Sequence, residues 1–416
     1  AAREATGQPG VRFHDLRHTA APLAGAPAAQ AVRDRTPLVP HLTALDGCSA
    51  VAALGVLLNH VALLSGYTGR HTGIGQYLAR AEVGVSIFFV LSGYLLYRRS
   101  VAYRREARAR RDTADYARRR VLRIVPAYWV ALTIVAFVLR APPFREPHSI
   151  VSHYLLLQVY DVNQVVGGPV QQAWTLATEV SFYVFLPVWA WLLARRSRTP
   201  ERQLRVAGLG VAALWGGSML LKLGALAAGT SAEHMGMMNT WLPFRMDEFA
   251  LGMALAVAAA WFRQRRVQLP TGTRAAVLTV ASWLVAAAIY WFLCPQLDMP
   301  LGPLYTPRQS VVLRALYSFV ALFLIAPAVF ASRDRGPAKA LLANRPIVGV
   351  GLISYSIYLW HEAWQDVYLR LTDQPPLQAD FLGMLAFTLV LSVVAAAVSW
   401  YVVERPVMRW GRTRRR

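Results

Sequence analysis

Ionisable side chains stand inside long apolar stretches of this sequence, where charge is costly and usually serves a function. They are His60, Glu179, the adjacent pair Asp247 and Glu248, and His361. A histidine near neutral pH can accept a proton from a hydroxyl group, or carry an acyl group on a ring nitrogen. A neighbouring carboxylate can orient its ring. These residue types therefore predict acid–base or covalent group transfer.

Each of these groups also has a structural interpretation. Histidines inside a membrane often form hydrogen bonds between helices. Glu179 can pair with Arg245, so that both charges are neutralised. Asp247 and Glu248 stand close enough to a membrane surface to be solvated. The functional interpretation depends on whether the groups meet at one place.

Two further features suit a donor substrate. Arg120 and Arg123 are three residues apart, which places both guanidinium groups on one face of a helix. Such a pair can bind phosphate groups, although basic loop residues also act as topology signals and lipid contacts. The run from Gly84 to Tyr94 contains Ser92-Gly93, small residues that permit close approach of a helix or a ligand, and we expect an irregular helix there.

The elements that carry these residues are apolar segments of about the 20 residues that a bilayer-crossing helix needs. Hydrophobic residues make up 56% of the chain and charged residues only 16%, a balance that is unusual for soluble proteins. We therefore expect an all-α, polytopic integral membrane protein with about ten transmembrane helices. The segments are 43–66, 82–97, 121–139, 173–194, 206–228, 244–262, 275–294, 311–332, 346–369 and 381–403.

The basic residues give this arrangement an orientation. If the N-terminus is cytoplasmic, 34 of the 44 lysines and arginines lie on the inner side and six lie on outer loops, as the positive-inside rule predicts. Both termini are then cytoplasmic. The net charge of +22 is thus an orientation signal, and we expect membrane lipid but no nucleic acid as a partner.

The topology also predicts where the ionisable groups lie in depth. His60 is roughly 22 Å from the inner end of its helix, and Glu179 is roughly 9 Å below the outer boundary. In a hydrocarbon core of about 30 Å, His60, His361 and Glu179 share one level, with Asp247 slightly above it. We expect one water-accessible cavity there.

Three regions follow from composition. Residues 1–42 are polar and rich in Ala, Pro and Arg, which predicts a disordered, basic cytoplasmic leader. Residues 43–404 form the membrane domain. Residues 405–416 form a basic cytoplasmic tail.

Seven short motifs, in order, resemble the membrane-bound acyltransferase-3 family, bacterial O-acyltransferases of cell-surface glycans and of some secreted metabolites. The resemblance covers residues 42 to 406. The motifs are Leu45-Asp46-Gly47 with the histidine that follows it, Gly84 to Tyr94, Arg120-x-x-Arg123-Ile-x-Pro126, Trp174-Thr-Leu-x-x-Glu179, Arg245-Met-Asp247-Glu248, Tyr358-Leu-Trp-His361 and Glu404-Arg405-Pro406.

The resemblance implies transfer of an acyl group, usually acetyl from acetyl-CoA, to a hydroxyl group. His60 stands at the family's histidine position and is the expected general base or acyl carrier, with Glu179 and His361 as further catalytic residues. Acyl-CoA is then a substrate, and we expect neither a metal nor a permanently bound cofactor. The protein is expected in the bacterial cytoplasmic membrane.

The expected donor site has one departure from the family. Members typically carry an arginine eleven residues before the histidine, and Ser49 stands at that position here. We assign donor binding to Arg120 and Arg123, which are expected to compensate, together with Ser49, Ser92 and Gly93.

The acceptor is expected to be a carbohydrate or small molecule with a hydroxyl group: a surface glycan, a glycolipid or a secreted metabolite. Asp247, Glu248 and Arg245 are the expected supporting groups, and Trp174 could stack on a sugar ring or anchor at the membrane interface. Two alternatives remain: a transporter or flippase that uses the buried charges as a proton relay, and an inactive acyltransferase-like scaffold.

Overall fold

The computed structural model describes most of the membrane domain. The described residues are 43–103, 109–139, 144, 147–161, 168–196, 199–296, 305–331 and 336–413. The chain divides into two units, Ala1–Pro40 and His41–Arg416. The expected leader 1–42 lies outside the described residues, and every described element belongs to the second unit. All regular elements in the described part of this unit are helical, which confirms the all-α class.

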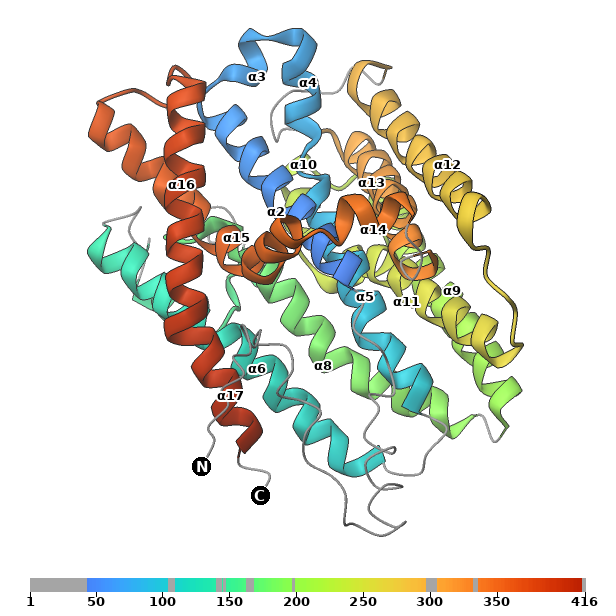
Figure 1. The fold of residues 1–416 in the computed structure, drawn as a ribbon. Helices are drawn as coiled ribbons and strands as arrows, with labels where there is room; N and C mark the ends of the chain where they lie inside the picture. The colour runs from blue at the N-terminus through green and yellow to red at the C-terminus, as the bar shows by residue number, and fades with distance from the viewer. Residues whose placement is uncertain are drawn as a thin grey trace, which may run out of the picture. The chain divides into compact units, whose positions relative to one another are not determined.

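Ten long helices in the described part coincide with the ten apolar segments (Figure 1). Their lengths run from 19 residues in α16 to 28 in α9 and α15. They are α2 (Thr43–Leu64), α5 (Val83–Tyr103), α6 (Ala109–Thr133), α8 (Trp174–Arg195), α9 (Pro200–Ala227), α11 (Leu242–Gln264), α12 (Gly272–Trp291), α13 (Pro307–Phe330), α15 (Arg345–Thr372) and α16 (Phe381–Ser399).

Shorter helical elements connect or extend the long helices. Three π-helical segments continue α6, α12 and α16 at their C-terminal ends. The short elements are α3 (Tyr67–Arg70), α4 (Thr72–Arg80), η1 (Ile134–Val138), α7 (Pro147–Tyr154), η2 (Gln158–Tyr160), η3 (Gln171–Ala173), α10 (Ala232–Met238), η4 (Phe292–Gln296), α14 (Pro337–Leu342), η5 (Trp400–Glu404) and α17 (Arg405–Thr413).

Eight spans of the described chain are long and apolar enough to cross a membrane, judged by length and composition. The long helices outside this group are α11 and α15, and their polar residues explain the difference. Helix α11 carries an arginine and two acidic residues within its first two turns, and α15 carries His361 and Glu362. The chain is a multi-pass membrane protein, and its candidate site residues lie on both the apolar spans and the two more polar helices.

The starts of several long helices follow from local sequence. Thr306 precedes Pro307 and forms a capping box with Gln309 at the start of α13. The side chain of Asn344 accepts a hydrogen bond from the backbone N–H of Ile347 at the start of α15. Such caps satisfy amide groups that the first turn leaves without partners.

Small residues let the central helices approach closely. A Cβ atom at Gly93 of α5 would lie 2.2 Å from the carbonyl oxygen of Phe249 in α11, and one at Gly252 would lie 2.0 Å from that of Val90. The close approach expected of Ser92-Gly93 is therefore present. The prediction of an irregular helix at these residues is wrong, because α5 is a continuous helix through both.

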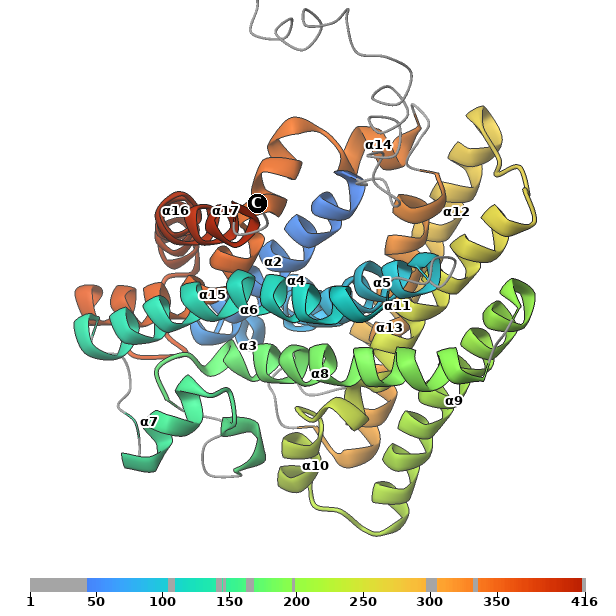
Figure 2. The same ribbon diagram turned by 90° about the horizontal axis from the view of Figure 1, so that it is seen from below.

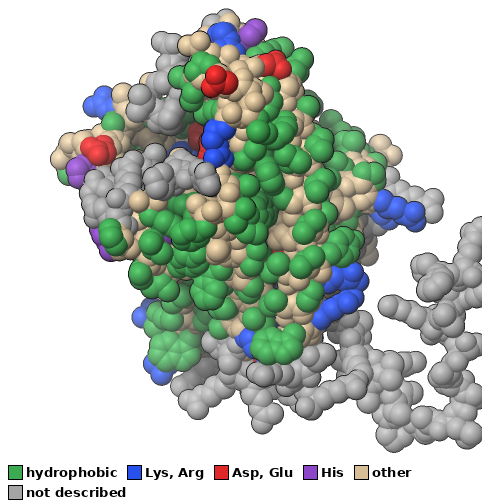
Figure 3. All heavy atoms as spheres, turned by 90° about the vertical axis from the view of Figure 1, so that its left-hand side faces the viewer, with side chains coloured by type: hydrophobic (Ala, Val, Ile, Leu, Met, Phe, Trp, Pro, Cys, Tyr) green, Lys and Arg blue, Asp and Glu red, His purple; other side chains and the backbone are tan. Residues whose placement is uncertain are grey.

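Helices α2 and α5 each pack against several other helices (Figures 1 and 2). Helix α5 packs against α11, α13 and α2, and α2 packs against α15 as well. Hydrophobic side chains cover much of the described surface on the side of α16, and Lys and Arg lie near both its upper and its lower parts (Figure 3). This pattern fits a helix bundle whose flank faces lipid.

Candidate active site

The two predicted histidines meet. His60 of α2 and His361 of α15 lie with Nδ1 of the first 2.9 Å from Nε2 of the second. The carboxylate of Glu362 is 2.8 Å from the same Nδ1 of His60. His361 is fully buried, whereas the side chains of His60 and Glu362 are 29% and 23% exposed. The site therefore joins one buried imidazole, that of His361, to one partly accessible imidazole, that of His60.

The hydrogen bonds determine which ring nitrogens carry protons. Nδ1 of His361 lies 2.7 Å from the carbonyl oxygen of Tyr358, and a carbonyl accepts only, so this nitrogen carries the hydrogen. Nε2 of neutral His361 is then an acceptor. Nδ1 of His60 faces that acceptor and the Glu362 carboxylate, so it must be the donor to both. In the neutral form of His60, Nε2 then carries the lone pair that a general base requires.

Helix packing far from the histidines positions them. A Cβ atom at Gly351 of α15 would lie 2.0 Å from the carbonyl oxygen of Asp46 in α2, so the two backbones touch there. From this contact, His60 is 14 residues along α2 and His361 is 10 residues along α15. The helices therefore run in the same direction from a common contact to the imidazole pair.

A cavity of ≈ 100 Å³ collects most of the expected donor-binding residues. Ser49, Ser92, Arg120 and Arg123 all line it, although they come from α2, α5 and α6. Gly93 does not line it; this residue faces the backbone of α11 instead. The structure thus brings together four of the five residues assigned to the donor.

The arginines of this cavity lack acidic partners. No described side chain forms an ion pair or hydrogen bond with Arg120 or Arg123. The guanidinium of Arg120 lies over the rings of Tyr116 and Tyr183, 5.9 and 5.6 Å from their centroids. Aromatic faces attract cations without neutralising them. The cavity therefore offers positive charge to an anionic ligand.

Glu179 lies in this cavity and not with the histidines. Its carboxylate accepts hydrogen bonds from Ser92 Oγ at 2.6 Å and from Tyr183 Oη at 2.5 Å. The expectation that Glu179 meets His60 and His361 is therefore wrong. The alternative interpretation, an ion pair between Glu179 and Arg245, is also wrong, because the Glu179 side chain extends from α8 towards α5. Helical rise gives only the position of a residue along its helix and says nothing about the direction of the side chain around the helix.

Tyr358 connects the two parts of the site. Its side chain lines the cavity, its carbonyl binds His361, and its ring lies 5.6 Å from the His361 ring. Its hydroxyl donates to the carbonyl of Gln172 and accepts from Thr175 Oγ1 at 3.0 Å. One residue therefore separates the arginine-lined cavity from the histidines while touching both.

The expected acceptor-side charges are paired inside the helix bundle. Arg245 binds Glu248 at 2.9 Å, and Lys222 binds Asp247 at 2.7 Å. All four side chains are at most 1% exposed. The expectation that the two carboxylates are solvated is wrong, because the buried Lys222 and Arg245 are their counter-ions. The predicted depths of the residues in the membrane did not identify these partners.

Trp174 is also engaged by the protein. The guanidinium of Arg245 lies 5.1 Å from the centroid of its indole. This ring face is therefore covered by a cation and is not offered to a sugar. In this structure Trp174, with Arg245, Asp247 and Glu248, supports the bundle beside the site.

Glu362 is the main residue that the sequence assignment left out. It follows His361 directly and so was visible in the sequence, but neighbours in a helix point about 100° apart. Its partner is instead the histidine of another helix. Tyr358, three residues before His361, carried the helical-spacing signal that could have predicted a shared face.

The cluster of His60, His361 and Glu362 also brings three ligand-type atoms within 4.8 Å of one another. Zinc bonds near 2.1 Å in a tetrahedral site hold ligand atoms about 3.4 Å apart. The separations of 2.8 and 2.9 Å from His60 Nδ1 are shorter, as expected when protons join the groups. The observed geometry is that of a hydrogen-bonded acid–base site.

The fold and the site together define a helical membrane protein with an imidazole pair beside a cationic cavity. The model of the acyltransferase-3 family, described as an acyltransferase domain, matches residues 42–404. The chain belongs to this family, as its motifs had suggested.

Two relatives show the range of similar proteins. The chain is 26% identical over 397 residues to acyltransferase MdmB of Streptomyces mycarofaciens, covering 90% of this chain and 93% of the relative. It is 23% identical over 392 residues to O-acetyltransferase OatA of Staphylococcus aureus, covering 89% of this chain. The chain spans only 58% of the length of OatA. No solved structure gives a significant match.

Proposed function

We propose that this protein is a membrane O-acyltransferase that moves an acyl group from acyl-CoA to a hydroxyl group. The observation that carries the proposal is the free Nε2 of His60, held as an acceptor by the partners of Nδ1, beside a cavity with two unpaired arginines. Family membership supports the reaction class. The donor and the acceptor are part of the proposal.

Coenzyme A would bind with its phosphates at Arg120 and Arg123. The cavity of ≈ 100 Å³ is too small for the whole nucleotide, so it would hold the phosphate groups, and the rest of the donor would extend beyond it. Guanidinium groups without carboxylate partners form the strongest hydrogen bonds with phosphate. The proposed acyl group is acetyl, because the name of OatA specifies acetyl for that relative.

His60 would then act on the acceptor. Its Nε2 takes the hydroxyl proton as the oxygen attacks the thioester carbonyl, and the carbon–sulfur bond breaks when the tetrahedral intermediate collapses. The proton passes from His60 to the departing thiolate, so that ester and free coenzyme A are formed. The alternative is a transient acyl group on Nε2 of His60.

The expected acceptor is a hydroxyl of a surface glycan, a glycolipid or a secreted metabolite, in the cytoplasmic membrane of a bacterium. Both MdmB and OatA come from bacteria. Mass spectrometry of surface glycans and secreted metabolites, with and without the gene, would identify the acylated product.

Thiol release tests the reaction. The purified protein in lipid nanodiscs should release free thiol from acetyl-CoA, and His60→Ala should lower the rate at least 100-fold, since general bases contribute about 10²–10⁴-fold. His71→Ala is a matched control, because His71 is exposed and stacks only on Tyr67. Thiol release by His60→Ala at the wild-type rate would overturn the mechanism. Absence of release from the wild type with any acceptor would favour the transporter or scaffold alternatives.

A further inference from the structure

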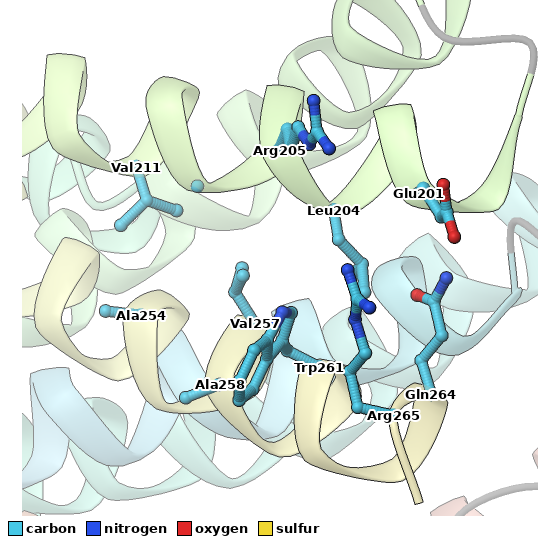
Figure 4. Close-up of a pocket in the computed structure, with 11 residues that line it drawn as sticks. Glu201, Leu204, Arg205, Val211, Ala254, Val257, Ala258, Trp261, Gln264 and Arg265 are labelled. Carbon is cyan, nitrogen blue, oxygen red and sulfur yellow. The ribbon is translucent and has the colours of Figure 1, made fainter.

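A second and larger cavity lies between α9 and α11, outside the candidate active site. Its volume is ≈ 360 Å³, within the range of small-molecule sites. Its walls come from the N-terminal part of α9 and the C-terminal part of α11 (Figure 4). The chemistry of the proposed transfer reaction does not use it.

The inner part of this cavity is lined by apolar side chains, several of them small. Leu204, Val211, Ala254, Val257 and Ala258 line it. Gly208 lines it too, and a Cβ atom built there would meet no other atom within 4 Å. Glycine inside a helix is destabilising relative to alanine, and here no protein neighbour requires it. The open space beside Gly208 therefore suits an apolar ligand.

The rim of the cavity is charged. Glu201 and Arg205 lie at the start of α9, and Gln264 and Arg265 lie at the end of α11. Figure 4 shows Gln264 and Arg265 extending from α11 towards Glu201 and Leu204. None of the described side chains forms an ion pair with either arginine or with Glu201. Positive and negative groups thus stand together without neutralising one another.

This rim lies at a membrane boundary. The span of α9 that is apolar enough to cross a membrane begins at Glu201. Trp261, which lines the cavity and is 45% exposed, belongs to the residue type that concentrates at membrane interfaces. An apolar groove that opens at headgroup level has lipid as its neighbour. A nucleotide would leave its polar edges against the apolar walls.

We propose that the groove between α9 and α11 binds a phospholipid with a primary ammonium headgroup, of the phosphatidylethanolamine type. One acyl chain lies along Gly208 and Ala258. The phosphate binds Arg205 and Arg265, and the ammonium binds Glu201. The carboxylate gives the selectivity, because it repels the head of an anionic lipid and cannot accept a hydrogen bond from a trimethylammonium group.

Native mass spectrometry of the full chain tests this site. The delipidated protein in detergent is offered equal amounts of the dioleoyl forms of phosphatidylethanolamine, phosphatidylglycerol and phosphatidylcholine. We expect the phosphatidylethanolamine adduct to exceed each of the others at least threefold. Equal binding of the three lipids, or preference for another one, overturns the proposal.

Variants locate the lipid in the groove. Gly208→Leu fills the open space and should lower the adduct at least fivefold, and Arg265→Ala should do the same from the rim. Glu201→Gln should abolish the preference over phosphatidylglycerol. The controls are Gly216→Leu, on the same helix and equally free of neighbours within 4 Å, and Arg263→Ala, which is outside the groove lining.

The outcomes separate this site from the transfer reaction. If the groove variants bind lipid as the wild type does, while the controls behave normally, the lipid lies elsewhere and the proposal fails. Because adduct mass is measured without acyl-CoA or acceptor, the result does not depend on whether the chain is an acyltransferase.

Discussion

Replacement of Glu362 by glutamine tests how His60 is oriented. The substitution keeps the side-chain length and one acceptor oxygen but removes the negative charge 2.8 Å from His60 Nδ1. When Nε2 takes a proton, the ring becomes a cation, and the carboxylate stabilises that cation. Glutamine cannot, so the effect should appear in the chemical step.

The magnitude follows from the hydrogen bond. Bonds to charged groups contribute about 1.5–3 kcal/mol, against about 1 kcal/mol between neutral groups. The loss is therefore about 0.5–2 kcal/mol, and at 1.36 kcal/mol per tenfold in rate this lowers kcat about 2- to 30-fold. The side chain is 23% exposed, and screening by solvent favours the lower end. A larger loss is not expected, because His361 Nε2 still accepts the Nδ1 hydrogen and keeps the tautomer.

The assay is steady-state thiol release with varied acyl-CoA. For Glu362→Gln, kcat should fall while KM for acyl-CoA stays within twofold, since Glu362 does not line the donor cavity. Asp366→Asn, one turn further along α15, is the control and should leave kcat unchanged. An unchanged kcat in Glu362→Gln, or a loss confined to KM, would refute the orientation argument.

Three further changes separate donor binding from bundle stability. Arg120→Ala should raise KM for acyl-CoA about 10- to 150-fold, because it removes a phosphate contact of about 1.5–3 kcal/mol; a change in kcat alone, in the thiol assay, would contradict this role. Ser49→Ala should leave KM within twofold, since among the described residues its hydroxyl bonds only the carbonyl of Leu45 at 3.2 Å; a large rise would show that this hydroxyl contacts the donor. Lys222→Met should destabilise the fold by about 3–5 kcal/mol by leaving Asp247 buried and unpaired, measured as a lower Tm in detergent. The double variant Lys222→Met with Asp247→Leu should recover most of the loss, and a double variant as unstable as the single one would argue against the ion pair.

The fold could be predicted from the sequence because lipid imposes one simple rule on each helix. A segment must be apolar over a fixed length, and the ten predicted segments correspond to ten helices of the described chain. The two most polar of these, α11 and α15, were predicted as well, because the apolar residues around their charges still extend over a helix length. Helix ends differ by several residues, as at α5, which continues to Tyr103.

The site could be predicted only in part, because depth in a membrane does not specify rotation about the helix axis. His60 and His361 share a level and face one another. Glu179 was placed at the same level, but it points into the arginine-lined cavity. The partner of Asp247 is Lys222, 25 residues earlier, and such pairing between helices depends on tertiary packing.

The backbone contact between Gly351 and Asp46 has a consequence for how this site can vary. It lies roughly 15 Å along α15 from His361, yet it determines how far apart the two helices stand where the imidazoles meet. A methyl group added at Gly351 would push α2 and α15 apart at this contact. The displacement would also increase the distance between the imidazoles of His60 and His361. The spacing of the proton-transfer groups therefore depends on a contact ten residues along α15 from His361, and relatives could adjust the reactivity of the histidine by changing side-chain size at this point while keeping every residue of the site.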